Sequence, residues 1–252
     1  MISKVLHQAK FDLLIFRRNP AATFFTLILP LIFLVLFTAL FGNNTTADGI
    51  KVSTFYVPGI LALAIVSATA VNLAITMTTR RERGVLKRIR STPLPSWVFI
   101  ASQAIGGLVL SILMTLIISV LGTTVYGAEF PIASLPSLVI TLIVGATSLT
   151  AVGLAMTVII PSEDAAPAVT NAIMLPLYFI SGIFVPDDDI PSWVSNIGSL
   201  FPVSHLNQAL QEFYLPQPDG ADLPWNHWLV IAGWGIVCAG IALKWFRWTP
   251  RR

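Results

Sequence analysis

Charge and cysteine are scarce in this 252-residue chain. Lysine, arginine, aspartate and glutamate together make up 11% of the residues, less than half the share that is typical of soluble domains. The single cysteine, Cys238, excludes an intrachain disulfide framework. Hydrophobic residues instead reach 55%, with a mean hydropathy of +0.80. The composition therefore excludes an ordinary soluble domain and predicts an all-α polytopic membrane protein with one domain, residues 1–252.

Residues for nucleotide or metal chemistry are also missing. No lysine is followed by serine or threonine, so the Walker A motif that holds ATP phosphates is excluded throughout the chain. No Ser-His-Asp, zinc or paired-carboxylate pattern lies near a predicted membrane face. His7, His205 and His227 are too far apart in the predicted topology for a metal site. We therefore expect that this chain is not an enzyme by itself and binds no cofactor or metal.

Six hydrophobic runs are each long enough to cross a bilayer, which takes roughly 20 helical residues. They are predicted at 21–42, 55–79, 97–121, 135–160, 165–185 and 225–246. Before them, residues 1–20 are predicted to form an amphipathic helix in the membrane interface, because apolar residues recur at helical spacing while Lys4, Gln8 and Asp12 lie mostly off that stripe. The alternative for this segment is a frayed tail that touches lipid.

The distribution of basic residues predicts the orientation. All but Lys51 of the fifteen lysines and arginines lie in three patches: before the first span, in the loop 80–95, and at the C-terminal end from Lys244 onward. Cytoplasmic loops carry an excess of lysine and arginine. Both termini and the loop 80–95 are therefore expected in the cytoplasm.

Polar side chains inside the predicted spans are few and uncharged, which argues against a proton- or ion-coupled carrier. Asn72 and Asn171, with the aromatic residues Tyr178, Phe179 and Phe184, are candidates for a substrate path. Two alternatives stay open. Asn72 shares a face with small residues and suits close helix contact, and the aromatic residues suit ordinary anchoring at the membrane interface.

The basic loop 80–95 has an internal pattern as well as charge. A short helix here would gather three apolar side chains on one side: Val85, Leu86 and Ile89. Glu82 is expected to pair with Arg83 or Lys87, and Pro93 ends the helix. The alternative is a charge cluster that orients the protein and contacts only lipid headgroups. However, an apolar face among charges needs a membrane or protein surface against which to be buried.

The outer segment 186–224 is predicted to hold two short amphipathic helices, broken at Pro202, that dip into the outer leaflet. Apolar residues recur at helical spacing on both sides of this proline. Irregular backbone at that depth is tolerated only where it packs on protein or lines a wet cavity. The alternative is a surface loop. The run Asp187, Asp188 and Asp189 is expected to be a solvated cluster, since three adjacent side chains cannot converge on one calcium ion.

Two stretches resemble the ABC type-2 exporter permeases. The run Arg81-Glu82-Arg83-Gly84-Val85-Leu86-Lys87-Arg88-Ile89, followed by Ser91-Thr92-Pro93-Leu94, is similar to the cytoplasmic coupling loop of that family, and Ser181-Gly182-Ile183-Phe184-Val185-Pro186 is similar to an outer stretch of it. The resemblance covers the whole chain. It implies a coupling helix seated in a groove of an ATPase subunit, formed by Glu82, Arg83, Gly84, Leu86, Thr92, Pro93 and Leu94, with Val85 and Ile89 beside Leu86 on the docking side.

The same resemblance implies the outer gate and the partners. Re-entrant helices would cap the outer end of the pathway, with gate residues Pro186, Trp193, Phe201 and Pro202. The implied partners are two copies of an ABC ATPase, which use ATP and Mg, and a second permease chain, either identical or different. The complex is expected to lie in the lipid bilayer of a bacterial plasma membrane and to bind no nucleic acid.

The expected function is that of the membrane-spanning permease subunit of an ATP-driven ABC exporter, moving a hydrophobic or amphipathic small molecule, a drug or a lipid-like compound, out of the cytoplasm or inner leaflet. An alternative is a permease for a lipid-linked polysaccharide or a teichoic-acid-type polymer. A membrane-embedded enzyme or scaffold would need a polar catalytic cluster, and a secondary transporter would need charged residues in the spans.

Overall fold

Helices form all the regular secondary structure that is described in the computed structural model of the chain, which covers residues 2–41, 52–126, 132, 134–185, 191–214 and 223–250. Their order is α1 (Ile2–Arg17), α2 (Pro20–Thr23), the π-helical η1 (Phe24–Ile28), α3 (Leu29–Phe41), α4 (Val52–Val66), the π-helical η2 (Ser67–Val71), α5 (Asn72–Glu82), α6 (Val85–Arg90), α7 (Ser96–Tyr126), α8 (Leu135–Met156), α9 (Ala165–Ile180), α10 (Ser192–Gly198), α11 (Pro202–Tyr214) and α12 (Trp225–Trp245).

Five helical runs within the described residues are long and apolar enough to cross a membrane. They are Pro20–Phe41, Phe55–Glu82, Ser96–Tyr126, Leu135–Met156 and Trp225–Trp245, and they correspond to the first four predicted spans and the last one. The all-helical membrane fold predicted from the sequence is therefore confirmed.

The fifth predicted span is shorter than expected. Helix α9 ends at Ile180, five residues before the predicted end at Val185. Gly182 follows in the left-handed conformation, with φ of 69°, which is the usual way for a chain to leave a helix. Sixteen residues extend about 24 Å, less than the hydrocarbon core of about 30 Å. Whether α9 crosses the bilayer stays a prediction.

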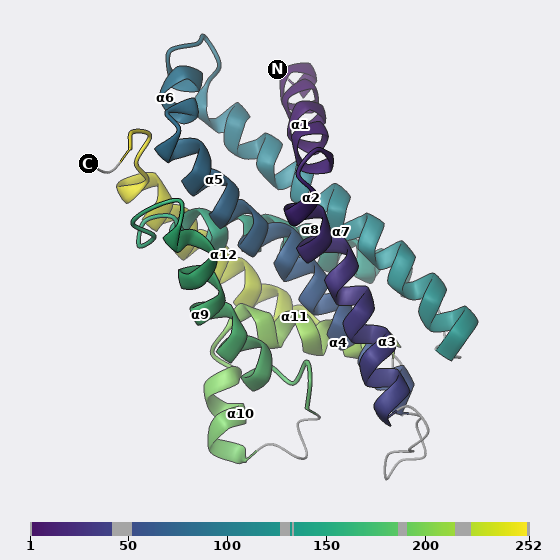
Figure 1. Cartoon of the computed structure of the whole chain (residues 1–252). Helices are drawn as coiled ribbons and strands as arrows, with labels where there is room; N and C mark the ends of the chain where they lie inside the picture. Colours follow the sequence, from purple (N-terminus) through teal and green to yellow (C-terminus); the bar gives the residue numbers. More distant parts are fainter. Residues whose placement is uncertain are drawn as a thin grey trace.

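The ends of the helix bundle differ in charge. Helices α1 and α6 and the C-terminal end of the described chain lie at one end of the bundle, whereas α10 lies at the other (Figure 1). The described residues of the three basic patches therefore share one end, as expected from their assignment to one side of the membrane.

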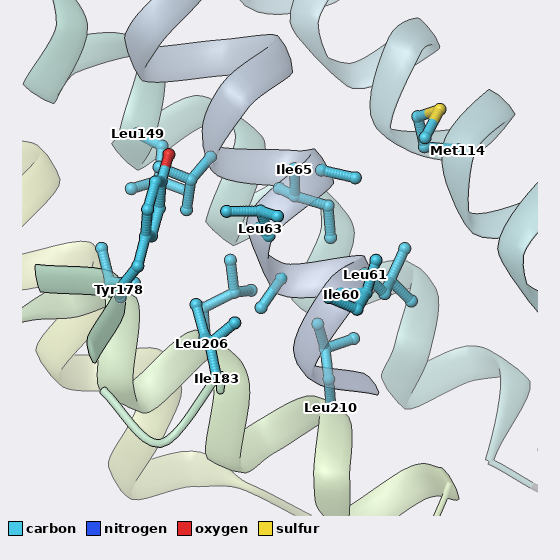
Figure 2. Close-up of a cluster of buried hydrophobic side chains, with 14 of the residues drawn as sticks. Ile60, Leu61, Leu63, Ile65, Met114, Leu149, Tyr178, Ile183, Leu206 and Leu210 are labelled. Atoms are coloured by element: carbon cyan, nitrogen blue, oxygen red, sulfur yellow. The ribbon is translucent and has the colours of Figure 1, made fainter. Parts of the chain in front are cut away.

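Helix α4 lies at the centre of the bundle. Side chains 60–66 are buried all around the helix, as expected for a helix enclosed by others. Leu210 of α11 lies beside Ile60 of α4 (Figure 2), and Leu206 belongs to the same buried cluster. Elsewhere in the bundle, small residues allow two helix backbones to approach closely, as is common in membrane proteins. A Cβ atom on Gly153 of α8 would lie 2.6 Å from the backbone oxygen of Ala70 in η2, so these two backbones are in direct contact.

The outer segment contains two short helices, α10 and α11, and α11 begins at Pro202 as predicted. The corner between them is fixed to α12, because Phe201 stacks on Trp234 at 5.8 Å between ring centroids and Trp234 Nε1 donates to the Leu200 carbonyl at 2.8 Å. Trp193 on α10 is exposed. Pro186 and residues 187–189 lie outside the described residues, so their predicted roles are not addressed by the structure.

Helix α1 corrects one part of the sequence interpretation. Its buried face is formed by Val5, Ala9 and Asp12, packed on α7, whereas Ile2 and Leu6 are exposed. The sequence pattern puts Asp12 mostly off the apolar stripe, and the structure nevertheless buries it. The amphipathic pattern was assigned to one apolar stripe, but α1 has an apolar face for its surroundings and a second face, containing Asp12, for the bundle.

Candidate functional site

The basic loop forms a defined turn and helix at the charged end of the bundle. Helix α5 continues to Glu82, and Gly84 then takes the left-handed conformation with φ of 70°, which glycine adopts without the steric cost of a Cβ atom. Helix α6 follows from Val85 to Arg90. The short helix predicted from the apolar spacing is therefore present.

The apolar side of α6 is packed against the chain itself. Leu86 has no exposed surface and joins a cluster that includes Met77, Phe99 and Leu154, with Ile89 and Leu94 packed against its edge. The expectation that the Leu86 side chain docks on a partner is therefore wrong. The outward surface consists instead of Arg83, Lys87, Arg88, Arg90, Ser91, Thr92 and Pro93, all of which are exposed. Leu86 positions this surface.

Arg81 connects the loop to helix α8. Its side chain is 1% exposed. Nη1 donates to the Thr157 carbonyl at 2.8 Å and Nη2 donates to the Ile160 carbonyl at 2.9 Å. These carbonyls lie just after α8 ends, where carbonyl groups lack intrahelical partners. Arg81 therefore caps one helix from another. In the sequence it is one of six basic residues in a loop, and no local signal marks its partners.

Two acidic residues form ion pairs with arginines of the basic loop. Glu82 accepts from Arg81 Nε at 2.8 Å, and its expected pairing with Arg83 or Lys87 stays a prediction. Arg83 instead reaches across to Glu163, with Nε 3.2 Å from Oε2. The hydrogen bond from Arg83 to Glu163 and the charge of this carboxylate raise the pKa of the exposed guanidinium. The loop is thereby joined to the turn between α8 and α9 by one buried arginine and one exposed arginine.

The residues predicted for a substrate path do not converge within the chain. Asn72 lines a pocket beside α1 and α7. Asn171 and Phe179 are exposed on α9, whereas Tyr178 is buried in the central core. Phe184 is also buried, and it stacks on Phe37 with ring centroids 5.3 Å apart. The exposed pair on α9 is open to contact with another molecule, and the buried pair packs the bundle.

Comparison with known proteins agrees with this architecture. The family model described as "ABC-2 type transporter" matches residues 6–215. The chain belongs to the ABC-2 type transporter family. It is 26% identical to the daunorubicin resistance ABC transporter permease protein DrrB1 of Streptomyces coeruleorubidus, over 78% of this chain and 70% of the relative. It is 23% identical to the putative transport permease YvfS of Bacillus subtilis, over 85% of each chain.

A third relative is longer than this ABC-2 family member. The probable multidrug ABC transporter permease YbhR of Escherichia coli is 23% identical over 68% of this chain, and the match spans 46% of YbhR. The chain therefore corresponds to about half of that relative.

A pair of histidines in this ABC-2 family member also corrects the sequence interpretation. His205 Nδ1 and His227 Nδ1 lie 2.8 Å apart, although the predicted topology separated them. Helix α11 packs on α12 and brings them together. His227 Nε2 lies 3.3 Å from Glu212 Oε1. Among the described residues, no three His, Cys, Asp or Glu side chains are placed to hold a metal ion.

The hydrogen-bond partners of this pair fix a tautomer. His205 Nε2 lies 2.8 Å from the Ser199 carbonyl, which can only accept a hydrogen bond, so Nε2 carries the proton. Neutral His205 then accepts at Nδ1 from His227. Burial lowers the pKa of His205 below its ordinary value, against the opposing effect of the hydrogen bond to Ser199. The junction of α10, α11 and α12 is therefore built for a neutral His205.

Proposed function

We propose that this chain is the membrane-spanning permease subunit of an ATP-driven ABC exporter. The observation that carries the proposal is the outward surface of α6 and residues 91–93, which stands on a rigid base at the basic end of the bundle. Exposed, like-charged surface held in one fixed geometry suits docking on a protein partner. ATP and Mg would be used by that partner, an ABC ATPase in two copies, because this chain has no Walker A lysine.

The proposed mechanism starts from how α6 is held. Closure of the ATPases would push on Lys87, Arg88 and the Thr92–Pro93 turn. The displacement would pass to the bundle through Leu86, which is packed among helices α5, α7, α8 and α12, and through Arg81, which is hydrogen-bonded to the end of α8. Packed interiors transmit such shifts because they deform little. Two permease chains, each with six spans and cytoplasmic termini, would then rock apart in a bacterial plasma membrane.

The proposed cargo is a hydrophobic or amphipathic small molecule. The printed names of YbhR and DrrB1 refer to multidrug transport and daunorubicin resistance, and both would suit cargo of this kind. Asn171 and Phe179 on α9 offer a polar and an aromatic side chain on an exposed face. We place them at the path between this chain and the second permease chain.

The test uses charge reversal on the outward surface, so that the buried anchor is left intact. The variant carries Lys87→Glu and Arg88→Glu, and the control carries Lys10→Glu on α1, an exposed lysine at the same end of the bundle. Copurification of a Walker-A-bearing ATPase and ATP-dependent efflux from inverted vesicles are measured. We expect the variant to lose both and the control to keep both. Normal copurification and efflux in the variant would contradict the docking role.

A further inference from the structure

A pocket lies between α1, α7 and the η2–α5 part of the second span. Its volume is about 70 Å³, and its polar lining includes Asp12, Asn19, Asn72, Thr76, Arg80 and Gln103. A polar cavity needs at least about 10–15 Å³ of such volume to hold one water, so this one has room for more than one. The pocket is partly open to the surface, so an occupant larger than one water can enter it.

The pocket contains a buried ion pair. Arg80 Nη1 lies 2.8 Å from Asp12 Oδ1, with the side chains 11% and 8% exposed. Asp12 Oδ2 accepts from Gln103 Nε2 at 2.6 Å and from Ser102 Oγ at 3.2 Å. Asp12 Oδ1, by contrast, has no partner in hydrogen-bonding geometry among the described residues, and only the charge of Arg80 compensates it. A buried carboxylate oxygen in this state can take a further donor.

The free space lies beside Gly106 of α7. Gly106 is buried, yet a Cβ atom built on it would meet nothing within 4 Å. Elsewhere the same helix packs closely, because a Cβ atom on Gly107 would lie 3.0 Å from Thr69 Cγ2. The opening at Gly106 is therefore local, and a side chain placed there would point into the pocket instead of into a neighbouring helix.

The lining defines the ligand chemistry. Asp12 and Arg80 carry opposite charges, so a ligand with net charge would leave one charge uncompensated at low dielectric, whereas a zwitterion satisfies both. Phe16 and Leu110 add an apolar wall, which suits an attached hydrocarbon chain. Exposed Ile2 and Ile15 on α1 give that helix an outer face for lipid. We propose that this pocket binds the zwitterionic headgroup of a membrane phospholipid, with the ammonium group at Asp12 and the phosphate at Arg80.

The test measures which lipid the purified full-length chain retains. The chain is equilibrated with equal amounts of phosphatidylethanolamine and anionic phosphatidylglycerol that have the same acyl chains, and bound lipid is counted by native mass spectrometry. We expect the ethanolamine lipid to be preferred by about tenfold to a hundredfold, the effect of one charge-assisted hydrogen bond. Equal retention of both lipids would overturn the proposal.

Two variants and one control locate the binding. Gly106→Ile fills the pocket and should abolish the preference, whereas Gly240→Ile, at an exposed glycine of α12 with equally open surroundings, should keep it. Asp12→Asn leaves Arg80 unpaired and should reverse the preference toward phosphatidylglycerol. Misfolding cannot produce that reversal. An unchanged preference in Asp12→Asn, or equal effects of the two isoleucine variants, would contradict the assignment.

A third measurement identifies the source of the headgroup. Soluble glycerophosphoethanolamine is added at the concentration of the lipid. Retention of the bound lipid supports a membrane ligand, whereas its displacement would overturn the lipid assignment in favour of a free zwitterion. No ATPase takes part in these measurements. The lipid site can therefore fail while the export test at Lys87 and Arg88 succeeds, and the reverse also holds.

Discussion

Replacement of Arg81 probes the link between the basic loop and the bundle. Its two terminal nitrogens donate to the carbonyls of Thr157 and Ile160 at the same time, and a lysine ammonium has no planar fork with which to reach both. Arg81→Lys therefore loses one buried, charge-assisted hydrogen bond, which is worth about 1.5–3 kcal/mol. Arg81→Met loses both and leaves two carbonyl oxygens without partners, at a cost of about 3–6 kcal/mol.

The free energy of unfolding in bicelles, measured by steric trapping, tests this ranking. The matched control is Arg83→Lys, because Arg83 is an exposed arginine two residues further along the chain that also pairs with a carboxylate. Exposed pairs contribute little, so we expect no measurable change. The reasoning is refuted if Arg81→Lys is as stable as the wild type. It is refuted equally if the two lysine variants lose the same amount.

Two further predictions concern the anchor of α6 and the histidine pair. Leu86→Ala should destabilise the chain by about 2–5 kcal/mol, because Leu86 is fully buried and its truncation leaves a cavity. The free energy of unfolding, measured by steric trapping, tests this value. A loss of stability no larger than that of exposed Lys87→Ala would contradict it. Burial lowers the pKa of His205, so the stability that it contributes is present above its ordinary pKa of 6.5 and is lost as the pH falls through the lower folded value. The amide hydrogen exchange of α10 and α11, compared with that of free peptide, should therefore speed up as the pH is lowered from about 7.5 to 5. His205→Asn should remove this pH-dependent increase. An unchanged pH dependence in the variant would refute the role of His205.

The membrane spans were predictable because their cause is local. A run of about 20 apolar residues is sufficient to mark a crossing helix, and five of the six runs are present with ends close to those expected. Helix α9 was overestimated because apolar composition continues past Ile180, whereas the chain leaves the helix there through Gly182. Hydropathy counts side chains and does not register a backbone turn.

The partners of charged residues were not predictable in the same way. Asp12 and Arg80 are 68 positions apart in the sequence, and Arg81 finds its acceptors in backbone carbonyls, which every residue possesses. The apolar spacing predicted α6 correctly but also led to the expectation that its apolar face docks on a partner. An apolar face can be buried against its own chain as well as against a partner. Leu86 is buried against its own chain. The spacing of apolar residues shows that a helix face must be buried, and only the tertiary structure shows which surface buries it.

The end of α5 joins the two proposed sites. Successive helical residues point about 100° apart, so Arg80 reaches α1 while Arg81 reaches the end of α8. This turn of α5 is thus held from two sides and cannot move toward one partner without losing the other. Gly84 turns the chain just beyond it in the left-handed conformation, and Leu86 is buried again two residues later. If α6 is the docking element that we propose, a push on its outward surface would therefore move α5 together with α1 and α8.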